Sequence, residues 1–213
     1  MNVDVVVLSC DKYSKYWDYF FKLKNKYWKD CPYKTYLVTE TKKRPRTKMI
    51  NVDSPIWTKR FRIALEQLNS DYVIVLLEDY FIRSRVLQDR IEQCLEYMKS
   101  DFDPIVWNFE HNYRKSSGLG MPSGWLNQYN RQVYLNSCQP SLWNRKRLIE
   151  RLKKDQSAWE WELTIVDSPY DHYIDNHNAY TIDVGYRYGQ EFGVKQGKLT
   201  DEAKEFLNKE GLI

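Results

Sequence analysis

The chain has 213 residues, of which 42% are hydrophobic and 29% are charged, and its net charge at pH 7 is +4. This length suits one domain with a sizeable core, and no apolar run reaches the roughly 20 residues of a membrane helix. The small net charge gives no reason to expect a nucleic-acid partner, and the opening MNVDVVVLSC lacks the basic start and long apolar stretch of a secretory signal. Four separated cysteines without a CxxC pair, and only three histidines, predict reduced cytosolic thiols rather than a zinc site.

The hydrophobic pattern predicts strands and helices that alternate along the chain. Residues 3–8 form an almost unbroken Val/Leu run, which is typical of a strand covered on both faces. Large residues at helical spacing follow from Ser14 and end at Cys31-Pro32. The remaining predictions, in chain order, are a strand at 36–38, a strand ending at 52–53, a helix within 54–69, a strand at 72–79, a helix at 84–99, a strand at 105–110, a long loop at 111–130, a strand at 133–137, a helix at 141–154, a strand at 179–184 and a helix at 200–209.

This alternation predicts a single α/β domain over residues 1–213, with a mainly parallel central sheet flanked by helices. In such sheets, ligands bind beyond the carboxyl ends of the strands. The loop at 111–130 is long enough to be functional or mobile. The eight Trp and seventeen Tyr residues either fill the core or line a site for bases or sugar rings.

Two adjacent acids, Glu78 and Asp79, end the predicted strand VIVLL without an intervening turn residue. Because successive strand residues point to opposite faces, at least one carboxylate should face the ligand crevice. Close carboxylates repel each other unless a cation joins them. Mg²⁺ or Mn²⁺ held there would neutralise a diphosphate leaving group. The alternative is an exposed strand end paired with Arg83 or Arg85.

Five segments follow one another in the chain: VVVLSCDKY, SPIWTKRFRIAL, DYVIVLLEDYF, QPSLWNRKRLIERL and SAWEWE. In this order they resemble the GT-A-type glycosyltransferases, in particular small bacterial enzymes that build capsular, lipopolysaccharide or other surface glycans. The resemblance covers most of residues 3–165 and implies a GT-A (Rossmann-like) fold, with a nucleotide-sugar half at about 1–100 and an acceptor half at about 101–213. LEDYF stands at the position of the family's DxD metal motif but lacks the second acid. Asp79 must therefore hold the ion, or metal use is weakened.

The resemblance also implies where the nucleotide and a further metal ligand lie. The turn after the first strand would line the base and ribose pocket with Ser9, Cys10 and Asp11. Asp11 either accepts a hydrogen bond from the ribose or the uracil, or only caps its loop. His177 or Asp175 would be a third metal ligand, because many GT-A enzymes place such a ligand, often a histidine, in a C-terminal loop; the alternative for His177 is a lone surface histidine.

Cationic side chains suggest how phosphate groups could be held. Arg60 lies with Trp57 at the entrance of the helix within 54–69, and its planar guanidinium pairs well with phosphate oxygens. The alternative is an ordinary solvated helix face. Arg60, Trp57 and Glu78 complete the predicted nucleotide-sugar site. The basic loop at 42–48 is either a solvated turn or a contact with anionic lipid head groups, to which each Lys or Arg contributes about 1 kcal/mol.

An acceptor site is predicted around SAWEWEL at 157–163. Inverting sugar transfer needs one carboxylate to take the proton of the acceptor hydroxyl, and the resemblance places this base at Glu160 or Glu162, with Glu162 slightly preferred. Aromatic walls beside such a carboxylate raise its proton affinity. The Trp side chains would stack on the acceptor sugar; the alternative is the buried side of an ordinary amphipathic helix. The predicted acceptor residues are Glu110, His111, Trp159 and Trp161.

These features predict a metal-dependent glycosyltransferase of the cytoplasm, or of the inner face of its membrane. It would move a sugar, with inversion, from a nucleotide-diphosphate sugar (a UDP-sugar by preference) to a glycan or lipid-linked hydroxyl in surface polysaccharide synthesis. One alternative is a sugar-phosphate nucleotidyltransferase, which is disfavoured because LSCDKYSKYW has no glycine-rich phosphate loop. The other is a non-enzymatic carbohydrate-binding module. Exposed aromatics could also serve a homo-oligomer contact.

Overall fold

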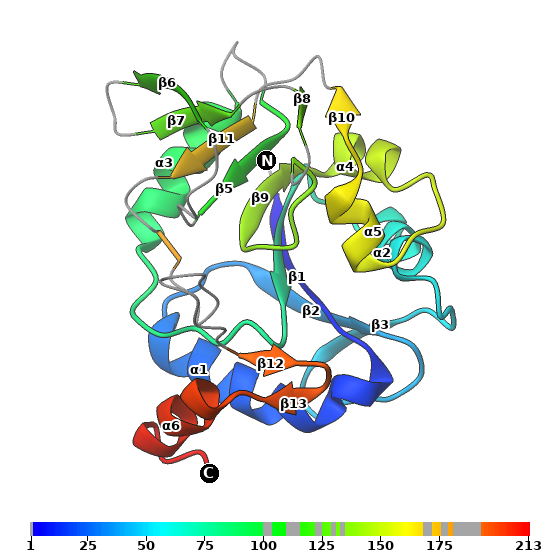
Figure 1. Cartoon of the computed structure of the whole chain (residues 1–213), viewed down its shortest axis with the longest axis vertical. Helices are drawn as coiled ribbons and strands as arrows, with labels where there is room; N and C mark the ends of the chain where they lie inside the picture. Colours follow the sequence, from blue (N-terminus) through cyan, green and yellow to red (C-terminus); the bar gives the residue numbers. More distant parts are fainter. Residues whose placement is uncertain are drawn as a thin grey trace.

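The computed structural model describes residues 2–99, 104–109, 116–121, 125–128, 131–132, 135–167, 172–175, 179–180 and 193–213 (Figure 1). The strands are β1 (Val3–Leu8), β2 (Lys34–Thr39), β3 (Lys48–Asn51), β4 (Tyr72–Leu77), β5 (Val106–Asn108), β6 (Ser116–Met121), β7 (Trp125–Gln128), β8 (Arg131–Gln132), β9 (Ser141–Asn144), β10 (Val166–Asp167), β11 (His172–Asp175), β12 (Val194–Lys195) and β13 (Lys198–Leu199). The helices are the 3₁₀ helix η1 (Asp11–Tyr16), α1 (Trp17–Tyr27), α2 (Trp57–Glu66), α3 (Gln88–Met98), α4 (Arg145–Arg151), α5 (Ala158–Leu163) and α6 (Asp201–Lys209).

Nine strands of the described residues form one mixed sheet, in the order β3-β2-β1-β4-β9-β5-β11-β7-β6. β1 pairs in parallel with β2 and β4, so that Leu8 lies between Val38 and Leu77. Of these nine strands, β9 and β7 run against the other seven. The chain moves outward from β1 to β3 and then crosses back to β4 on the other side of β1. Such a reversal point is where open α/β sheets bind ligands, beyond the carboxyl ends of the strands.

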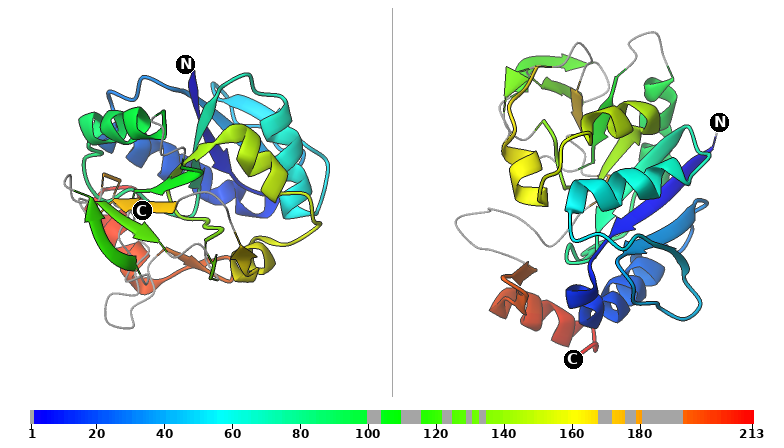
Figure 2. Two further views of the ribbon diagram at one scale, coloured as in Figure 1. Left: turned by 90° about the horizontal axis from the view of Figure 1, so that it is seen from above. Right: turned by 90° about the vertical axis from the view of Figure 1, so that its right-hand side faces the viewer.

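Helices cover both faces of the sheet (Figure 2). Alternate residues of β1 show the division: Val5 and Val7 pack on the side of α1 and α3, whereas Val6 and Leu8 pack on the side of α2, α4 and α5. A strand buried on both faces needs such an unbroken apolar run. Each fully buried Val or Leu side chain stabilises the fold by about 1.5–3 kcal/mol. The Val/Leu run of the first strand is thus explained by its central place.

The C-terminal segment packs against the start of the chain. The Thr200 hydroxyl accepts a hydrogen bond from the Ala203 N–H at 3.2 Å and so caps α6. Ala203 and Leu207 are buried in an apolar cluster with Tyr16 and Phe81. Figure 1 shows α6 and the β12–β13 hairpin beside α1. Residues from both ends of the chain therefore share one small core.

The predicted α/β class, with a mainly parallel central sheet flanked by helices, is confirmed, and so is the helix predicted at 200–209. The helix predicted at 141–154 is wrong in its first turn. Residues 141–144 form β9 because Leu142 and Trp143 are buried between β4 and β5, and only Arg145–Arg151 is helical. Tertiary packing here overrides the local pattern.

Other boundaries also differ from the prediction. The predicted loop at 111–130 contains β6 and β7, an antiparallel pair at the edge of the sheet. The third strand ends at Asn51 rather than at 52–53, and the helix predicted at 84–99 begins only at Gln88. Residues 135–137 and 179–180 are irregular rather than in strands, and the rest of the predicted strands at 133–137 and 179–184 lies outside the described residues. Within the described parts of the chain, no helix combines the length and apolarity needed to cross a membrane.

Candidate active site

The carboxyl ends of β1 and β4 bring two turns together at the reversal point of the sheet. Residues 9–11 leave β1, and Glu78 and Asp79 leave β4 beside them. The Ser9 N–H donates to the Val38 carbonyl at 2.9 Å, which ties the first turn to β2. The indole Nε1 of Trp17 donates to Ser9 Oγ at 2.6 Å. β2 and α1 therefore both fix the position of Ser9.

Glu78 and Asp79 form a carboxyl pair that is largely removed from water. Glu78 is 4% exposed. Burial, and then the charge of Asp79, raise the pKa of Glu78 well above its usual range, although a hydrogen bond from Ser9 opposes this. Burial raises the pKa of Asp79 to about 7. The pair consequently resists ionisation unless positive charge or hydrogen-bond donors are supplied.

One oxygen of this pair has an unmet bonding capacity. Asp79 as a residue is partly exposed, but its Oδ1 atom is buried and has no hydrogen-bond partner among the described residues. Buried polar atoms in native proteins are nearly always bonded to something, because an unbonded one destabilises the fold. Asp79 Oδ1 is therefore placed for a ligand.

Cys10 and Tyr13 lie near the pair. Burial, and then the charge of Glu78, raise the pKa of the Cys10 thiol. Burial, and then the charge of Asp79, raise the pKa of the Tyr13 hydroxyl, which also forms a hydrogen bond with the backbone of Gly197. Both side chains are therefore neutral at pH 7. The Gly197 contact brings the β12–β13 hairpin to the same edge of the sheet.

Arg60 reaches this edge from α2. Its side chain is buried, and Nη1 lies 2.8 Å from Glu40 Oε1 and donates to the Ser54 carbonyl at 2.6 Å. Its positive charge also lowers the pKa of Glu78, against the larger effects that raise it. The predicted phosphate contact of Arg60 stays a prediction. The structure brings Arg60 into electrostatic reach of the acid pair.

Asp11 holds the loop that follows β2. Its carboxylate accepts hydrogen bonds from Thr39 Oγ1 at 2.7 Å, Thr41 Oγ1 at 2.6 Å and the Lys42 N–H at 3.0 Å. Burial raises the pKa of Asp11, but the bonds from Thr41, Lys42 and Thr39 outweigh it and bring that pKa to about 2. These contacts match the loop-capping alternative. A ribose or uracil bond would have to share the same oxygens.

The segment SAWEWEL folds into α5, and its two acids make different contacts. Glu160 Oε2 accepts the Ser157 N–H at 2.8 Å while the Glu160 N–H donates to Ser157 Oγ at 3.2 Å, which completes a capping box. Glu162 Oε1 accepts the Cys138 N–H at 2.8 Å. Glu160 therefore closes the helix start, and Glu162 bonds to the chain segment that leads into β9.

The two Trp side chains of α5 lie in opposite environments. Trp161 is 1% exposed, and its ring lies 5.4 Å from the ring of Trp57 between centroids. Trp57 is also close to Phe61, so these rings fill the core between α2 and α5. Trp159 is 63% exposed. Of the two predicted stacking residues, only Trp159 presents its ring to solvent.

Three predicted residues, Glu110, His111 and His177, lie outside the described residues. Asp175, the alternative to His177, is buried and pairs with Arg90 at 3.0 Å. Within the described ranges, no group of three or more His, Cys, Asp or Glu side chains could hold a metal ion. Hard divalent ions, however, are often held by one or two carboxylates together with substrate phosphates. The unbonded Asp79 Oδ1 beside the Glu78 carboxyl fits that donor set. The residues present thus fit a two-carboxylate site completed by a ligand.

Sequence reasoning missed two residues of this edge, Glu40 and Tyr13. Glu40 follows β2 directly, so the shared edge of parallel strands was a usable signal. Glu40 Oε2 accepts the Asp11 N–H at 2.6 Å and its Oε1 contacts Arg60, which links β1, β2 and α2. Tyr13 had no comparable signal, because its position depends on the 3₁₀ turn of η1.

No protein-family model and no curated protein matches the chain in sequence. Among solved structures, a cytidylyltransferase from Leptospira borgpetersenii matches with a TM-score of 0.48 and 8% identity over 76% of this chain and 68% of that one. The bifunctional IspDF from Campylobacter jejuni matches with 0.45 and 11% over 76% of this chain and 46% of that one. The galactosyltransferase LgtC, in complex with donor and acceptor sugar analogues, matches with 0.44 and 15% over 74% of this chain and 63% of that one. The chain therefore spans only part of the length of each, and two kinds of transferase stand together among the matches, so no family is resolved.

Proposed function

We propose that this chain is a glycosyltransferase of GT-A type that uses a nucleotide-diphosphate sugar. The observation that carries the proposal is the buried Glu78–Asp79 pair, with its unbonded Asp79 Oδ1, at the reversal point of an α/β sheet. Arg60 and Glu40 extend this polar edge towards β2. A nucleoside diphosphate with a divalent cation supplies the positive charge that the pair lacks and the phosphate oxygens that complete the cation's ligands.

In the proposed reaction, the acceptor hydroxyl oxygen forms a bond to the anomeric carbon while the bond from that carbon to the diphosphate oxygen breaks. The electron pair of the broken bond stays on the nucleoside diphosphate, and the hydroxyl proton passes to a carboxylate base. Glu162 is the proposed base, with Glu160 as the second choice because its carboxylate already closes the capping box. A single displacement of this kind inverts the anomeric centre. Mn²⁺ or Mg²⁺ on Asp79 and Glu78 would neutralise the charge of the leaving diphosphate.

The donor is proposed to be a UDP-sugar, and the acceptor a glycan or a lipid-linked saccharide of surface polysaccharide synthesis. A cytoplasmic enzyme would meet a lipid-linked acceptor at the inner face of the membrane. The basic loop offers a contact there. Lys42 Nζ bonds to Ser14 and Arg44 pairs with Asp18 at 3.0 Å. Lys42, Lys43, Arg46 and Lys48 are all exposed, and Lys48 Nζ lies over the Tyr36 ring.

A thermal-shift panel of UDP, GDP, CDP and ADP, each with and without Mn²⁺, tests this proposal. A ligand at 100 times its dissociation constant stabilises the folded state by about 2.7 kcal/mol, which raises the melting temperature of a chain of this size by about 5–10 °C. We expect one nucleotide to give this shift with Mn²⁺. Asp79→Asn should abolish the shift, and the exposed Asp53→Asn should keep it.

Two results would overturn the proposal. One is the absence of a shift with every nucleoside diphosphate in Mn²⁺ and in Mg²⁺. The other is an unchanged shift in the Asp79→Asn variant. CTP and UTP complete the panel, and a shift with one of them but with none of the diphosphates would indicate a nucleotidyltransferase instead.

A further inference from the structure

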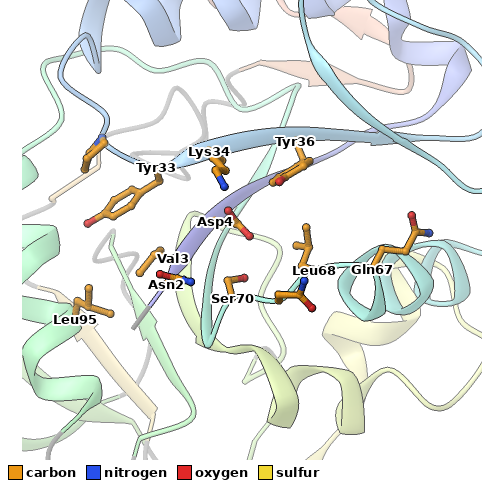
Figure 3. A pocket seen from close by; sticks show the side chains of 12 residues that line it. Asn2, Val3, Asp4, Tyr33, Lys34, Tyr36, Gln67, Leu68, Ser70 and Leu95 are labelled. Carbon is orange, nitrogen blue, oxygen red and sulfur yellow. The ribbon is translucent and has the colours of Figure 1, made fainter.

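A pocket of about 460 Å³ opens at the amino ends of β1 and β2 (Figure 3). Its walls are the start of β1, the chain entering β2, and residues 67–70 between α2 and β4. Since Glu78 and Asp79 follow the carboxyl end of β4, the pocket lies at the opposite edge of the same parallel strands. Pockets of roughly 300–1,000 Å³ are typical of sites for small molecules.

One polar side-chain atom of this pocket, Ser70 Oγ, is buried without a partner, and the Asp4 carboxylate lies close by without a bonding partner among the described residues. Asp4 is 9% exposed and Ser70 is 2% exposed. In Figure 3 the Asp4 carboxylate lies between the side chains of Ser70 and Lys34. Ser70 Oγ has no hydrogen-bond partner in the part of the chain that the structure describes, and no hydrogen bond or ion pair joins the Asp4 carboxylate to a described residue. An unpartnered buried polar atom destabilises a fold, so a ligand that bonds to Ser70 Oγ and also to the Asp4 carboxylate would stabilise this one.

The charge balance of the pocket indicates which ligand it favours. Asp4 and Lys34 are the charged side chains among the described residues that line it, so their formal charges cancel. An anionic ligand would face the Asp4 carboxylate, and a cationic one would face Lys34. A neutral ligand avoids both conflicts.

The remaining lining groups are suited to hydroxyl groups. The amide side chains of the pocket offer both donors and acceptors, from Asn2, Gln67 and Asn69. Tyr36 adds an aromatic ring on the face of β2 that also carries Lys34. Lys48 Nζ lies over this ring at 5.8 Å from its centroid, so a ligand would stack on the side of the ring that Lys48 does not cover. A ligand with many hydroxyl groups can donate to Asp4, accept from Lys34 and the amides, and place its apolar C–H face on the ring.

We propose that this pocket is a saccharide-binding site for a neutral sugar of one or two rings. Hydroxyl groups of the sugar donate to the Asp4 carboxylate and bond to Ser70 Oγ. The site is separate from the proposed transferase site, and its chemistry does not require that the chain transfer sugars.

Saturation-transfer NMR and calorimetric titration of the full chain test the site, with D-glucose, D-galactose, N-acetylglucosamine and maltose as probes. We expect at least one of them to bind saturably, with a dissociation constant on the order of 1 mM. Asp4→Asn keeps the shape of the side chain but removes its charge, and should weaken binding at least about tenfold because bonds to charged groups are the stronger ones. Ser70→Ala should weaken it severalfold. The exposed Asp89→Asn on α3 is the matched control and should bind as the wild type does.

Further measurements separate this site from the transferase site and from misfolding. Asp79→Asn should leave saccharide binding intact, even if it abolishes the nucleotide-dependent shift. Asp4→Asn and Ser70→Ala should not lower the melting temperature, because each changes a group without a partner; if Asp4→Asn does lower it, Ser70→Ala decides alone. The proposal is overturned if none of the four sugars binds, if both pocket variants bind like the wild type, or if choline or inorganic phosphate occupies the pocket in their place.

Discussion

The Glu78–Asp79 pair is suited to bind a cation, but it destabilises the folded chain when no cation is bound. Burial raises the pKa of both carboxyl groups, Asp79 to about 7. Between the unfolded pKa values near 4 and these folded values, the native state binds more protons than the unfolded chain. The contribution of this pair to the free energy of unfolding is therefore greatest at low pH, and it falls as the pH rises through about 4 to 7 and beyond.

The Asp79→Asn variant should reverse this loss. In EDTA at pH 8, the free energy of unfolding of this variant should be about 2 kcal/mol higher than that of the wild type. The reason is that one buried charge and its repulsion of Glu78 are gone. At pH 4, where Asp79 is protonated in the folded state, the difference should nearly vanish. Urea unfolding followed by fluorescence across this range measures both values.

Asp53→Asn, which changes an exposed carboxylate, should show no such pH dependence. If Asp79→Asn were less stable than the wild type at pH 8, the Asp79 carboxylate would be stabilised by its surroundings, and the case for a missing cation would fail.

At the scale of single residues, the sequence predicts the site best where charged residues come directly after the end of a strand. The acids after VIVLL and Arg60 of the preceding helix do meet at one edge, because parallel strands direct their carboxyl ends to the same side. Sequence reasoning could not choose between the two roles of Asp11. That choice depends on the Thr39 and Thr41 hydroxyls, whose approach to Asp11 requires the register of β1 against β2.

At the scale of elements, helices and strands with long apolar patterns are predicted well from the sequence, whereas short ones are not. The strand of β4 and the helix α2 stood out because their apolar residues recur over six or more positions. β9 has four residues, SLWN, and a helix begins directly after it. A run this short is compatible with either state, and only its place between β4 and β5 makes it a strand.

α5 offers a test of whether Glu160 acts as a cap. Ser157→Ala should lower the free energy of unfolding by about 1 kcal/mol, the usual effect of losing a serine cap. Glu160→Ala should destabilise the wild type more than it destabilises the Ser157→Ala variant, because the Ser157 hydroxyl also donates directly to Glu160 Oε2 at 2.8 Å. Urea unfolding of the two single variants and the double variant measures this coupling.

Glu150→Ala, which removes an exposed carboxylate from the neighbouring α4, serves as the control and should act additively with Ser157→Ala. Additive effects of Ser157→Ala and Glu160→Ala would mean that the Ser157 hydroxyl does not hold the Glu160 carboxylate, and Glu160 would return as an equal candidate for the base.

At the scale of the whole molecule, the C-terminal segment supports the acid pair from a distance in sequence of more than 100 residues. Phe81 comes two residues after Asp79 and is fully buried in the cluster formed with α6. The same segment reaches η1, where Tyr16 Oη and Lys15 Nζ donate to the Gly197 carbonyl at 2.7 and 2.9 Å. Residues 193–213 thus contact both chain segments of the candidate active site, the one after β1 and the one after β4.

This arrangement predicts that a cavity in the α6 cluster loosens the acid turn. Leu207→Ala should cost about 2–4 kcal/mol, because Leu207 is fully buried and its loss leaves a void against Phe81. Leu163→Ala removes the same atoms from a side chain that is 40% exposed, and should cost less than about 1 kcal/mol. Hydrogen exchange of the amides at 78–82 should quicken in Leu207→Ala and stay unchanged in Leu163→Ala. Equal exchange at 78–82 in both variants, despite the difference in stability, would show that the acid turn is held by the sheet alone and that α6 stabilises the chain without supporting the site.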